Sequence, residues 1–284
     1  MIILNEIQVF RPGFKYPSIS ITGDKCWLQC SYCRGRFLKT MIYVDNPNDL
    51  KDFVERMYNN INGFLLSGGF NKDGYLPIED YLIVLSEIKE KYDLSISVHP
   101  GLMNSNLIER LSEIGIDVID YELITDEYVI RYLKNLVKTP RDFIEIYERY
   151  IESGFKAVVP HIPIGLGKVD WVYDVIDYLT TTKQDNVVFL IAMDSDPAIW
   201  RDSLNILRIA RNKLNNLISL GCMRPFEYKR RYDKLIINNY LVDRIVNPIR
   251  EVISKGNYIV YETCCSLPNS LLNRPGMVSN QLFY

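Results

Sequence analysis

Short apolar runs alternate with helix-length amphipathic stretches along most of this chain, and this alternation constrains the fold more than any other feature. The runs have the lengths and the apolar content of buried strands. They span residues 18–22, 64–67, 94–99, 117–122, 157–161, 187–192 and 217–221. The stretches that read as helices span residues 48–60, 78–91, 105–114, 140–153, 170–180 and 199–213. Strands separated by helices indicate consecutive βα units and a parallel sheet.

Six or seven such units within 284 residues predict an α/β fold, a partial TIM-like (β/α)6–8 barrel. We expect residues 1–221 to form the barrel core and residues 222–284 to form a C-terminal extension. A doubly wound sheet is the competing fold, but no glycine-rich nucleotide-binding fingerprint follows the first predicted strand. Because the chemistry of such barrels lies at the carboxyl ends of the strands, residues that directly follow a strand are the first candidates for function.

The charge and the hydropathy of the chain argue against several kinds of partner. The formal net charge of −2 gives no sign of a surface for nucleic acid or anionic lipid. The basic run Lys229-Arg230-Arg231 is short, which is typical of a solvated face. No apolar run reaches the roughly 18 residues that a membrane-spanning helix needs, and the N-terminus lacks signal-peptide features. We therefore expect a cytoplasmic protein without nucleic-acid or membrane partners.

Three cysteines, Cys26, Cys30 and Cys33, follow the first predicted strand with the spacing CxxxCxxC. Thiolates are the ligands that iron–sulfur clusters prefer, so three of them can hold three irons of a 4Fe–4S cluster. The fourth iron then stays open for a substrate or a cofactor. A structural zinc site is an alternative, but it usually takes four ligands and neither histidine lies near this loop. A disulfide framework is unexpected, because 48% hydrophobic residues suffice to build a core.

The remaining cysteines are Cys222, which follows the last predicted strand, and the adjacent pair Cys264 and Cys265. Three further thiols can serve as ligands of a second iron–sulfur cluster. They can equally be inert thiols buried in the core, or a redox pair with a bystander. The residues alone leave these three readings open.

The cysteine loop, together with the strand before it, resembles the cluster loop of the radical S-adenosylmethionine (SAM) enzymes. The resemblance implies a partial barrel, in agreement with the alternation of strands and helices. It also implies that the open iron binds the amino and carboxylate groups of SAM. One electron from the cluster then cleaves SAM to methionine and a 5′-deoxyadenosyl radical, which removes hydrogen from an unactivated carbon.

Several residues resemble the SAM contacts of that family. Ser67, Gly68 and Gly69 resemble its glycine-rich motif, in which main-chain groups approach the amino group of SAM without a Cβ in the way. Phe70 stands where the family often has glutamate. The resemblance places Tyr32 beside the adenine ring, and packing against the cluster loop is its alternative role.

Two more places in the sequence match family contacts with the nucleoside. The segment that holds Ile164 and Gly165 resembles the fifth-strand segment that passes the adenine in biotin-synthase-like members. Glu122 or Asp120 would hydrogen-bond the ribose hydroxyls, and otherwise they are solvated acids at the end of a strand.

His99 and His161 are the two histidines of the chain, and each follows or ends a predicted strand. A single histidine is commonly a hydrogen-bonded structural residue. The position of both at the predicted active rim instead favours proton handling or substrate binding. We keep them as candidate catalytic residues.

The wider pattern of motifs resembles one biotin-synthase-related family, which supplies a subunit of the archaeal-type two-component lipoyl synthase. The motifs beyond the cluster loop that carry this resemblance lie at residues 66–69, 98–102, 160–162, 220–225 and 262–265. The resemblance implies sulfur insertion at two unactivated carbons of an octanoyl chain on a carrier protein. It implies that Cys222, Cys264 and Cys265 hold an auxiliary cluster, which is the sulfur donor, and that Ser266 or Arg224 completes or orients it.

The same resemblance implies three partners: an octanoylated carrier protein, a second radical SAM subunit and an electron donor such as ferredoxin. Two other functions compete with this one. One is a biotin-synthase-like rearrangement without a sulfur donor, and the other is a non-catalytic iron–sulfur or zinc scaffold. The glycine motif at residues 67–69 and the fifth-strand segment argue against the scaffold, because neither is needed merely to hold a metal.

Overall fold

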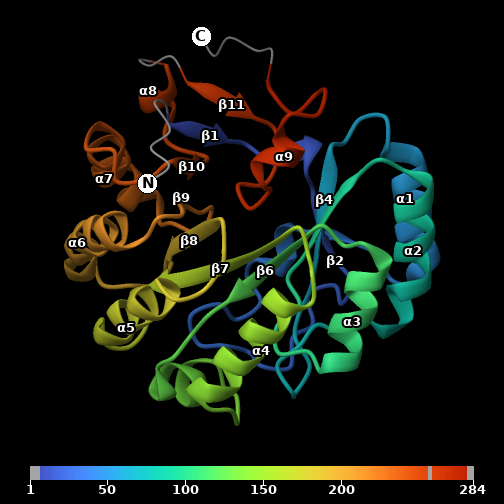
Figure 1. Ribbon diagram of the computed structural model, residues 1–284, viewed down its shortest axis with the longest axis horizontal. Helices are drawn as coiled ribbons and strands as arrows, with labels where there is room; N and C mark the ends of the chain where they lie inside the picture. The colour runs from blue at the N-terminus through green and yellow to red at the C-terminus, as the bar shows by residue number, and fades with distance from the viewer. Residues whose placement is uncertain (1–6, 255–257, 280–284) are drawn as a thin grey trace.

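The computed structural model describes residues 7–254 and 258–279, and within them eleven strands form one parallel sheet (Figure 1). The strands are β1 (Gln8–Phe10), β2 (Ser18–Ser20), β3 (Ile42–Tyr43), β4 (Gly63–Ser67), β5 (Ser95–Val98), β6 (Val118–Glu122), β7 (Ala157–Ile164), β8 (Asn186–Ile191), β9 (Leu217–Leu220), β10 (Arg244–Val246) and β11 (Ile259–Tyr261). Their order across the sheet is β11-β1-β10-β9-β8-β7-β6-β5-β4-β2-β3. The sheet curls into an incomplete barrel, so the predicted α/β partial barrel is confirmed.

Helices cover the outer face of the curled sheet (Figure 1). They are α1 (Pro47–Met57), α2 (Leu82–Lys91), α3 (Ser105–Ile114), α4 (Pro140–Glu152), α5 (Asp170–Leu179), α6 (Pro197–Lys213), α7 (Phe226–Asn238) and α8 (Arg250–Ile253), whereas the short α9 (Asn269–Leu272) lies on the inner side. Four of them begin after a side chain that accepts a backbone N–H bond, namely Asn46, Asn104, Thr139 and Asp196. Such caps satisfy donors that a helix leaves free at its start, which is why these helices begin where they do.

The seven predicted strands and the six predicted helices are all present, whereas β1, β3, β10 and β11 were not foreseen. These four have two or three residues each, too few for a run that a sequence pattern can separate from a loop. The sheet also continues past residue 221, where the C-terminal extension was predicted to begin. Ile245 of β10 pairs with Leu220 of β9, and β1 pairs with both β10 and β11.

The segment between β11 and residue 277 fills the inner side of the curled sheet. Leu267, Leu271 and Met277 belong to a buried cluster with inward-facing valines of the central strands. Those valines are Val118, Val159 and Val188. We call residues 262–277 the inner segment. Its position explains how cysteines from the end of the chain reach the barrel interior.

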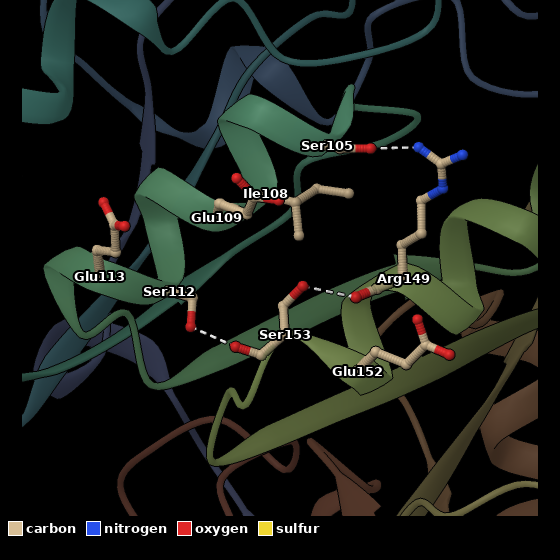
Figure 2. A pocket seen from close by; sticks show the side chains of 8 residues that line it. All are labelled: Ser105, Ile108, Glu109, Ser112, Glu113, Arg149, Glu152 and Ser153. Carbon is tan, nitrogen blue, oxygen red and sulfur yellow. Dashed lines mark hydrogen bonds between the residues drawn. The ribbon is translucent and has the colours of Figure 1, made fainter.

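The outer face holds a separate cavity of about 440 Å³ between α3 and α4 (Figure 2). Arg149 donates to the hydroxyl of Ser105, and the hydroxyl of Ser112 donates to the carbonyl of Ser153. These bonds tie the two helices together. None of the predicted site residues lines this cavity.

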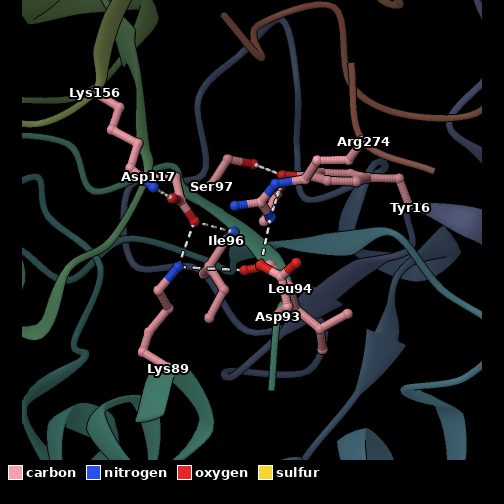
Figure 3. A network of polar contacts seen from close by, with 10 residues as sticks. Tyr16, Lys89, Asp93, Leu94, Ile96, Ser97, Asp117, Lys156 and Arg274 are labelled. Carbon is pink, nitrogen blue, oxygen red and sulfur yellow. Dashed lines mark hydrogen bonds and ion pairs between the residues drawn. The ribbon is translucent and has the colours of Figure 1, made fainter. Parts of the chain in front are cut away.

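A polar network joins the inner segment to the amino ends of β5 and β6 (Figure 3). Arg274 forms an ion pair with Asp93 at 3.0 Å, and Asn62 donates to the carbonyls of Glu262 and Gly276 at 3.1 and 3.0 Å. These contacts attach the inner segment to the opposite side of the curled sheet.

Asp117 is the centre of the same network. Lys89 and Lys156 contact its two carboxylate oxygens at 2.7 and 2.6 Å, and the N–H of Ile96 donates to it at 2.9 Å. Burial acts to raise the pKa of Asp117, but these hydrogen bonds outweigh it and hold the pKa below its usual value. The charged form of Asp117 therefore stabilises the fold.

Candidate active site

One cavity of about 280 Å³ lies inside the curled sheet, and all six cysteines line it. Of the other predicted site residues, Tyr32, Gly68, Gly69, His99, Glu122 and His161 line it as well. Ser67, Ile164 and Gly165 do not line it. Residues that are widely separated in the sequence are therefore brought to one place. The roles predicted for the nine that lie outside the cysteine groups stay predictions.

The first cysteine group lies on a loop without a regular helix, and Gln29 within it adopts a left-handed conformation with φ of 45°. The N–H of Trp27 donates to the carbonyl of Phe70 at 2.9 Å. A Cβ built on Gly69 would lie only 1.9 Å from the carbonyl oxygen of Lys25 and 2.6 Å from the Cβ of Cys26. Gly69 is thus required because the cysteine loop packs directly onto its Cα.

Residues 133–135 hold the other side of the same loop. The N–H of Ser31 donates to the carbonyl of Leu133 at 2.8 Å, and the side chain of Asn135 donates to the carbonyl of Leu28 at 2.9 Å. The thiol of Cys30 lies 3.7 Å from the carbonyl oxygen of Lys134. We call residues 133–135 the loop clamp. Sequence reasoning missed it, because nothing in a run such as Leu-Lys-Asn signals a distant contact.

The side chain of Lys134 enters the cavity wall and pairs with Glu122. The hydroxyl of Tyr32 donates to Glu122 at 3.2 Å, and the ammonium of Lys134 lies 3.4 Å from that hydroxyl. Burial alone would raise the pKa of Glu122, but the charge of Lys134 outweighs it and lowers the pKa. Glu122 is therefore a buried, ion-paired carboxylate rather than a solvated acid at the end of a strand.

The two histidines line the same cavity but differ in their surroundings. Burial lowers the pKa of His99 to about 4, so its imidazole is neutral near pH 7. The ring of His99 lies 5.1 Å from the ring of Phe70, centre to centre. His161 places Nδ1 3.0 Å from the carbonyl of Val159, which can only accept. This contact requires a proton on Nδ1. Nε2 is the ring nitrogen of His161 that the contact does not use.

The second cysteine group comes from the ends of two strands that are not neighbours in the sheet. Cys222 follows β9, whereas Cys264 and Cys265 follow β11, with β10 and β1 between them in the sheet. The side chain of Asn186 donates to the carbonyl of Cys265 at 3.0 Å. Arg224 donates to the carbonyls of Leu220 and Gly221, so it orients the turn before Cys222 and does not reach into the cavity.

Several of the thiols, Cys30, Cys222 and Cys264 among them, favour their protonated form while no metal binds them. Burial raises the pKa of Cys30 to about 11. The hydrogen bond with Cys265, together with burial and the charge of Asp120, raises the pKa of Cys264 well above its usual value. Burial also raises the pKa of Cys222, which lines the cavity. A cation that binds these sulfurs would therefore displace protons.

Asp120 lines the cavity near the second cysteine group, and only 6% of it is exposed. Its Oδ1 atom is buried and has no hydrogen-bond partner among the described residues. Burial raises the pKa of Asp120. The hydroxyl of Ser266 does not line the cavity, and its hydrogen bonding to Asp120 acts to lower the pKa of that carboxyl.

The donor chemistry of both cysteine groups fits an iron–sulfur cluster. All six cysteines are free thiols, in two groups of three on one cavity. Within the described part of the chain, no three His, Cys, Asp or Glu side chains are gathered as ligands of a single metal ion. A 4Fe–4S cluster does not need that arrangement, because each cysteine binds a different iron.

None of the helices in the described residues is long and apolar enough to span a membrane.

Comparison with known proteins agrees with this site. The radical SAM superfamily matches residues 20–179, which is more than half of the chain. A mitochondrial lipoyl synthase from Coprinopsis cinerea is 22% identical over 178 residues, which cover 61% of this chain. The match covers 45% of that protein, so the chain spans less than half the length of this curated relative.

Solved structures share the fold. Methylornithine synthase aligns with a TM-score of 0.59 at 15% identity, over 85% of this chain and 72% of that chain. The FeFe-hydrogenase maturase from Carboxydothermus hydrogenoformans aligns with a TM-score of 0.57 at 18% identity, over 85% of this chain and 58% of that chain. The family match runs from the end of β2, just before the first cysteine group, to the end of α5. The chain therefore belongs to the radical SAM superfamily, which implies a 4Fe–4S cluster and S-adenosylmethionine.

Proposed function

We propose that this chain is one subunit of a lipoyl-synthase-type enzyme, which inserts sulfur into an octanoyl chain on a carrier protein. The observation that carries the proposal is that two groups of three cysteines line one cavity. A single radical-generating cluster needs only Cys26, Cys30 and Cys33. The second group is therefore left for an auxiliary cluster next to the place where a carbon radical would form.

The chemistry of the two groups is complementary. When bound, a cluster with SAM at the first group would supply the radical that removes hydrogen, and a cluster at the second group would supply sulfide. Sulfur capture is efficient only when the donor lies next to the carbon that has lost hydrogen. The cavity that both groups line supports such an arrangement.

The lining of the cavity suits an aliphatic chain, because most of it is apolar. Apolar walls include Leu28, Phe37, Leu65, Leu190 and Val246. Such a surface binds a hydrocarbon chain and excludes water, which would otherwise quench reactive species. Glu122 and Lys134 concentrate charge near the first cysteine group, where the resemblance expects the polar parts of SAM.

The proposed partners are an octanoylated carrier protein, a second radical SAM subunit and an electron donor such as ferredoxin. The similarity to a lipoyl synthase supports the octanoyl substrate. Iron-binding thiols must stay reduced, so we place the reaction in the cytoplasm.

The test is the iron content of protein reconstituted without oxygen. We expect about eight irons in the wild type and about four after Cys222, Cys264 and Cys265 are all replaced by Ala. SAM cleavage should largely survive in the triple variant, whereas sulfur transfer to an octanoyl-lysine substrate should disappear. Leu267→Ala, in the same buried segment, is the control for lost packing and should keep about eight irons.

Equal iron in the wild type and the triple variant would contradict the auxiliary cluster. Buried core thiols predict that result, with about four irons in both proteins and a loss of stability alone. A rearrangement without a sulfur donor would then be the better assignment.

A further inference from the structure

Arg244 of β10 is fully buried at 0% exposure, next to the segment that carries Cys264 and Cys265. Its guanidinium donates to the carbonyls of Cys265 and Leu267 at 2.6 and 2.8 Å. It also donates to the side-chain oxygens of Asn269 at 2.6 Å and Gln8 at 3.0 Å. One side chain thus joins β10 and β1 to the inner segment.

All four of these acceptors are neutral. Asp243, the neighbouring carboxylate in the sequence, instead pairs with Arg211 at 2.9 Å. Among the described residues, no ion pair of Arg244 is found within 4.0 Å. The ring of Phe10, 5.2 Å from the guanidinium carbon, attracts the cation but does not neutralise it. The charge of Arg244 is therefore buried without a carboxylate at ion-pair distance in the described part of the chain.

A buried charge of this kind is normally paired, because its removal from water is costly. The negative charges that act on Arg244 come from four groups, namely Cys265, Tyr261, Asp243 and Cys264. Burial lowers the pKa of Arg244, and the charges of these four groups act in the opposite direction. Because the guanidinium also bonds the main chain of Cys265, its buried positive charge lies beside the second cysteine group.

We propose that Arg244 is a positioning residue of the second cysteine group: its hydrogen bonds fix the main chain at Cys265, and its buried positive charge favours a negatively charged iron–sulfur cluster there. This inference rests on the proposed function, because it requires the auxiliary cluster. It assigns to this one side chain both the geometry and the electrostatics of the second cysteine group.

The first experiment counts iron in reconstituted variants. Arg244→Gln removes the charge and most of the donors, so the iron content should fall from about eight to about four while SAM cleavage persists. Arg244→Lys keeps the charge but loses the planar fork, so it should hold an intermediate amount of iron. Arg211→Gln is the matched control, since Arg211 is half-buried, has its own carboxylate and bonds no cysteine. It should keep about eight irons.

The second experiment leaves Arg244 in place, in case its replacement prevents folding. Asn269 is exposed, and Asn269→Asp would give the guanidinium a carboxylate at the position of the present 2.6 Å bond. In the Cys30→Ala background the second cluster can be observed alone. The added negative charge should shift its reduction potential to a more negative value. Asn269→Ala removes the hydrogen bond without adding charge and should shift the potential less.

The outcomes separate the two proposals. About four irons in the wild type would refute the auxiliary cluster itself, whatever Arg244 does. About eight irons in the wild type and in Arg244→Gln, with no shift of potential in Asn269→Asp, would refute the role of Arg244 and leave the proposed function intact. A loss of second-site iron in Arg244→Gln, or a negative shift in Asn269→Asp, supports it.

Discussion

The two cysteine groups face the same cavity but are built in opposite ways. Cys26, Cys30 and Cys33 lie within eight consecutive residues, whereas Cys222 and Cys264 are 42 positions apart and come from strands that are not neighbours. The first group depends mainly on one loop and on what packs against it. The second depends on the placement of β9, β11 and the inner segment, so it forms only when the whole sheet has formed.

The supports of the two groups also differ. Near the first, Lys134 has a carboxylate partner in Glu122. Near the second, Arg244 has none among the described residues and donates to four neutral acceptors. A balanced cation can hold a site in the metal-free protein, while an unbalanced one favours the arrival of negative charge. The comparison therefore predicts that the first group is shaped before metal binds and that the second is stabilised by binding.

The largest expected effect comes from breaking the first group. Cys30→Ala removes one of three iron ligands, so reductive cleavage of SAM to 5′-deoxyadenosine should be abolished. Iron should fall from about eight to about four, because the second group keeps its cluster. Product analysis after reduction with dithionite measures the first effect. Undiminished 5′-deoxyadenosine in this variant would show that the radical is generated elsewhere.

The second-largest effect should come from breaking the ion pair between Lys134 and Glu122 beside the first cysteine group. Lys134→Met leaves Glu122 buried without its partner, which should cost about 3–5 kcal/mol of unfolding free energy. Urea unfolding of the metal-free protein measures this loss. Adding Glu122→Gln should restore much of the stability, because no uncompensated charge remains.

A small change in Lys134→Met would mean that the pair does not hold the metal-free site. The two groups would then be alike in their dependence on metal. Full stability in the double variant together with poor SAM cleavage would separate the structural role of the pair from its role in binding.

The smallest effect concerns acid stability and the attachment of the inner segment. The pKa of Asp117 in the folded protein lies below its unfolded value of about 3.9, so its contribution is present above that pH. It is lost as the pH falls through the lower, folded pKa. Unfolding free energy should therefore decrease in acid, and Asp117→Asn should be less stable at pH 7 and less sensitive to acid. Equal pH profiles for both proteins would contradict this role.

The sequence pattern located most of the barrel because each βα unit is encoded within a short stretch. The strand predicted at residues 117–122, for example, begins one residue before β6 and ends at the same residue. The pattern could not reveal that β1 lies between β10 and β11. Three residues from one end of the chain pair there with strands from the other end, and only long-range packing selects such partners.

The residues of the candidate site also differ in whether the sequence alone reveals them. The CxxxCxxC loop and the glycine after β4 are recognisable because their chemistry needs neighbours in sequence. Lys134 was missed, because an isolated lysine carries no sign that it will pair with Glu122 in a cavity wall. Arg244 was missed for the same reason, since its buried position is a property of the assembled sheet.

The sequence by itself determined the parallel βα architecture and the first cysteine group, because both follow from interactions between residues close in the chain. Only the tertiary structure decided that Cys222, Cys264 and Cys265 share a cavity with that group, and which charges surround them. The physical reason is that burial and charge pairing depend on the distance between atoms in space. A folded chain sets that distance through the packing of the whole sheet.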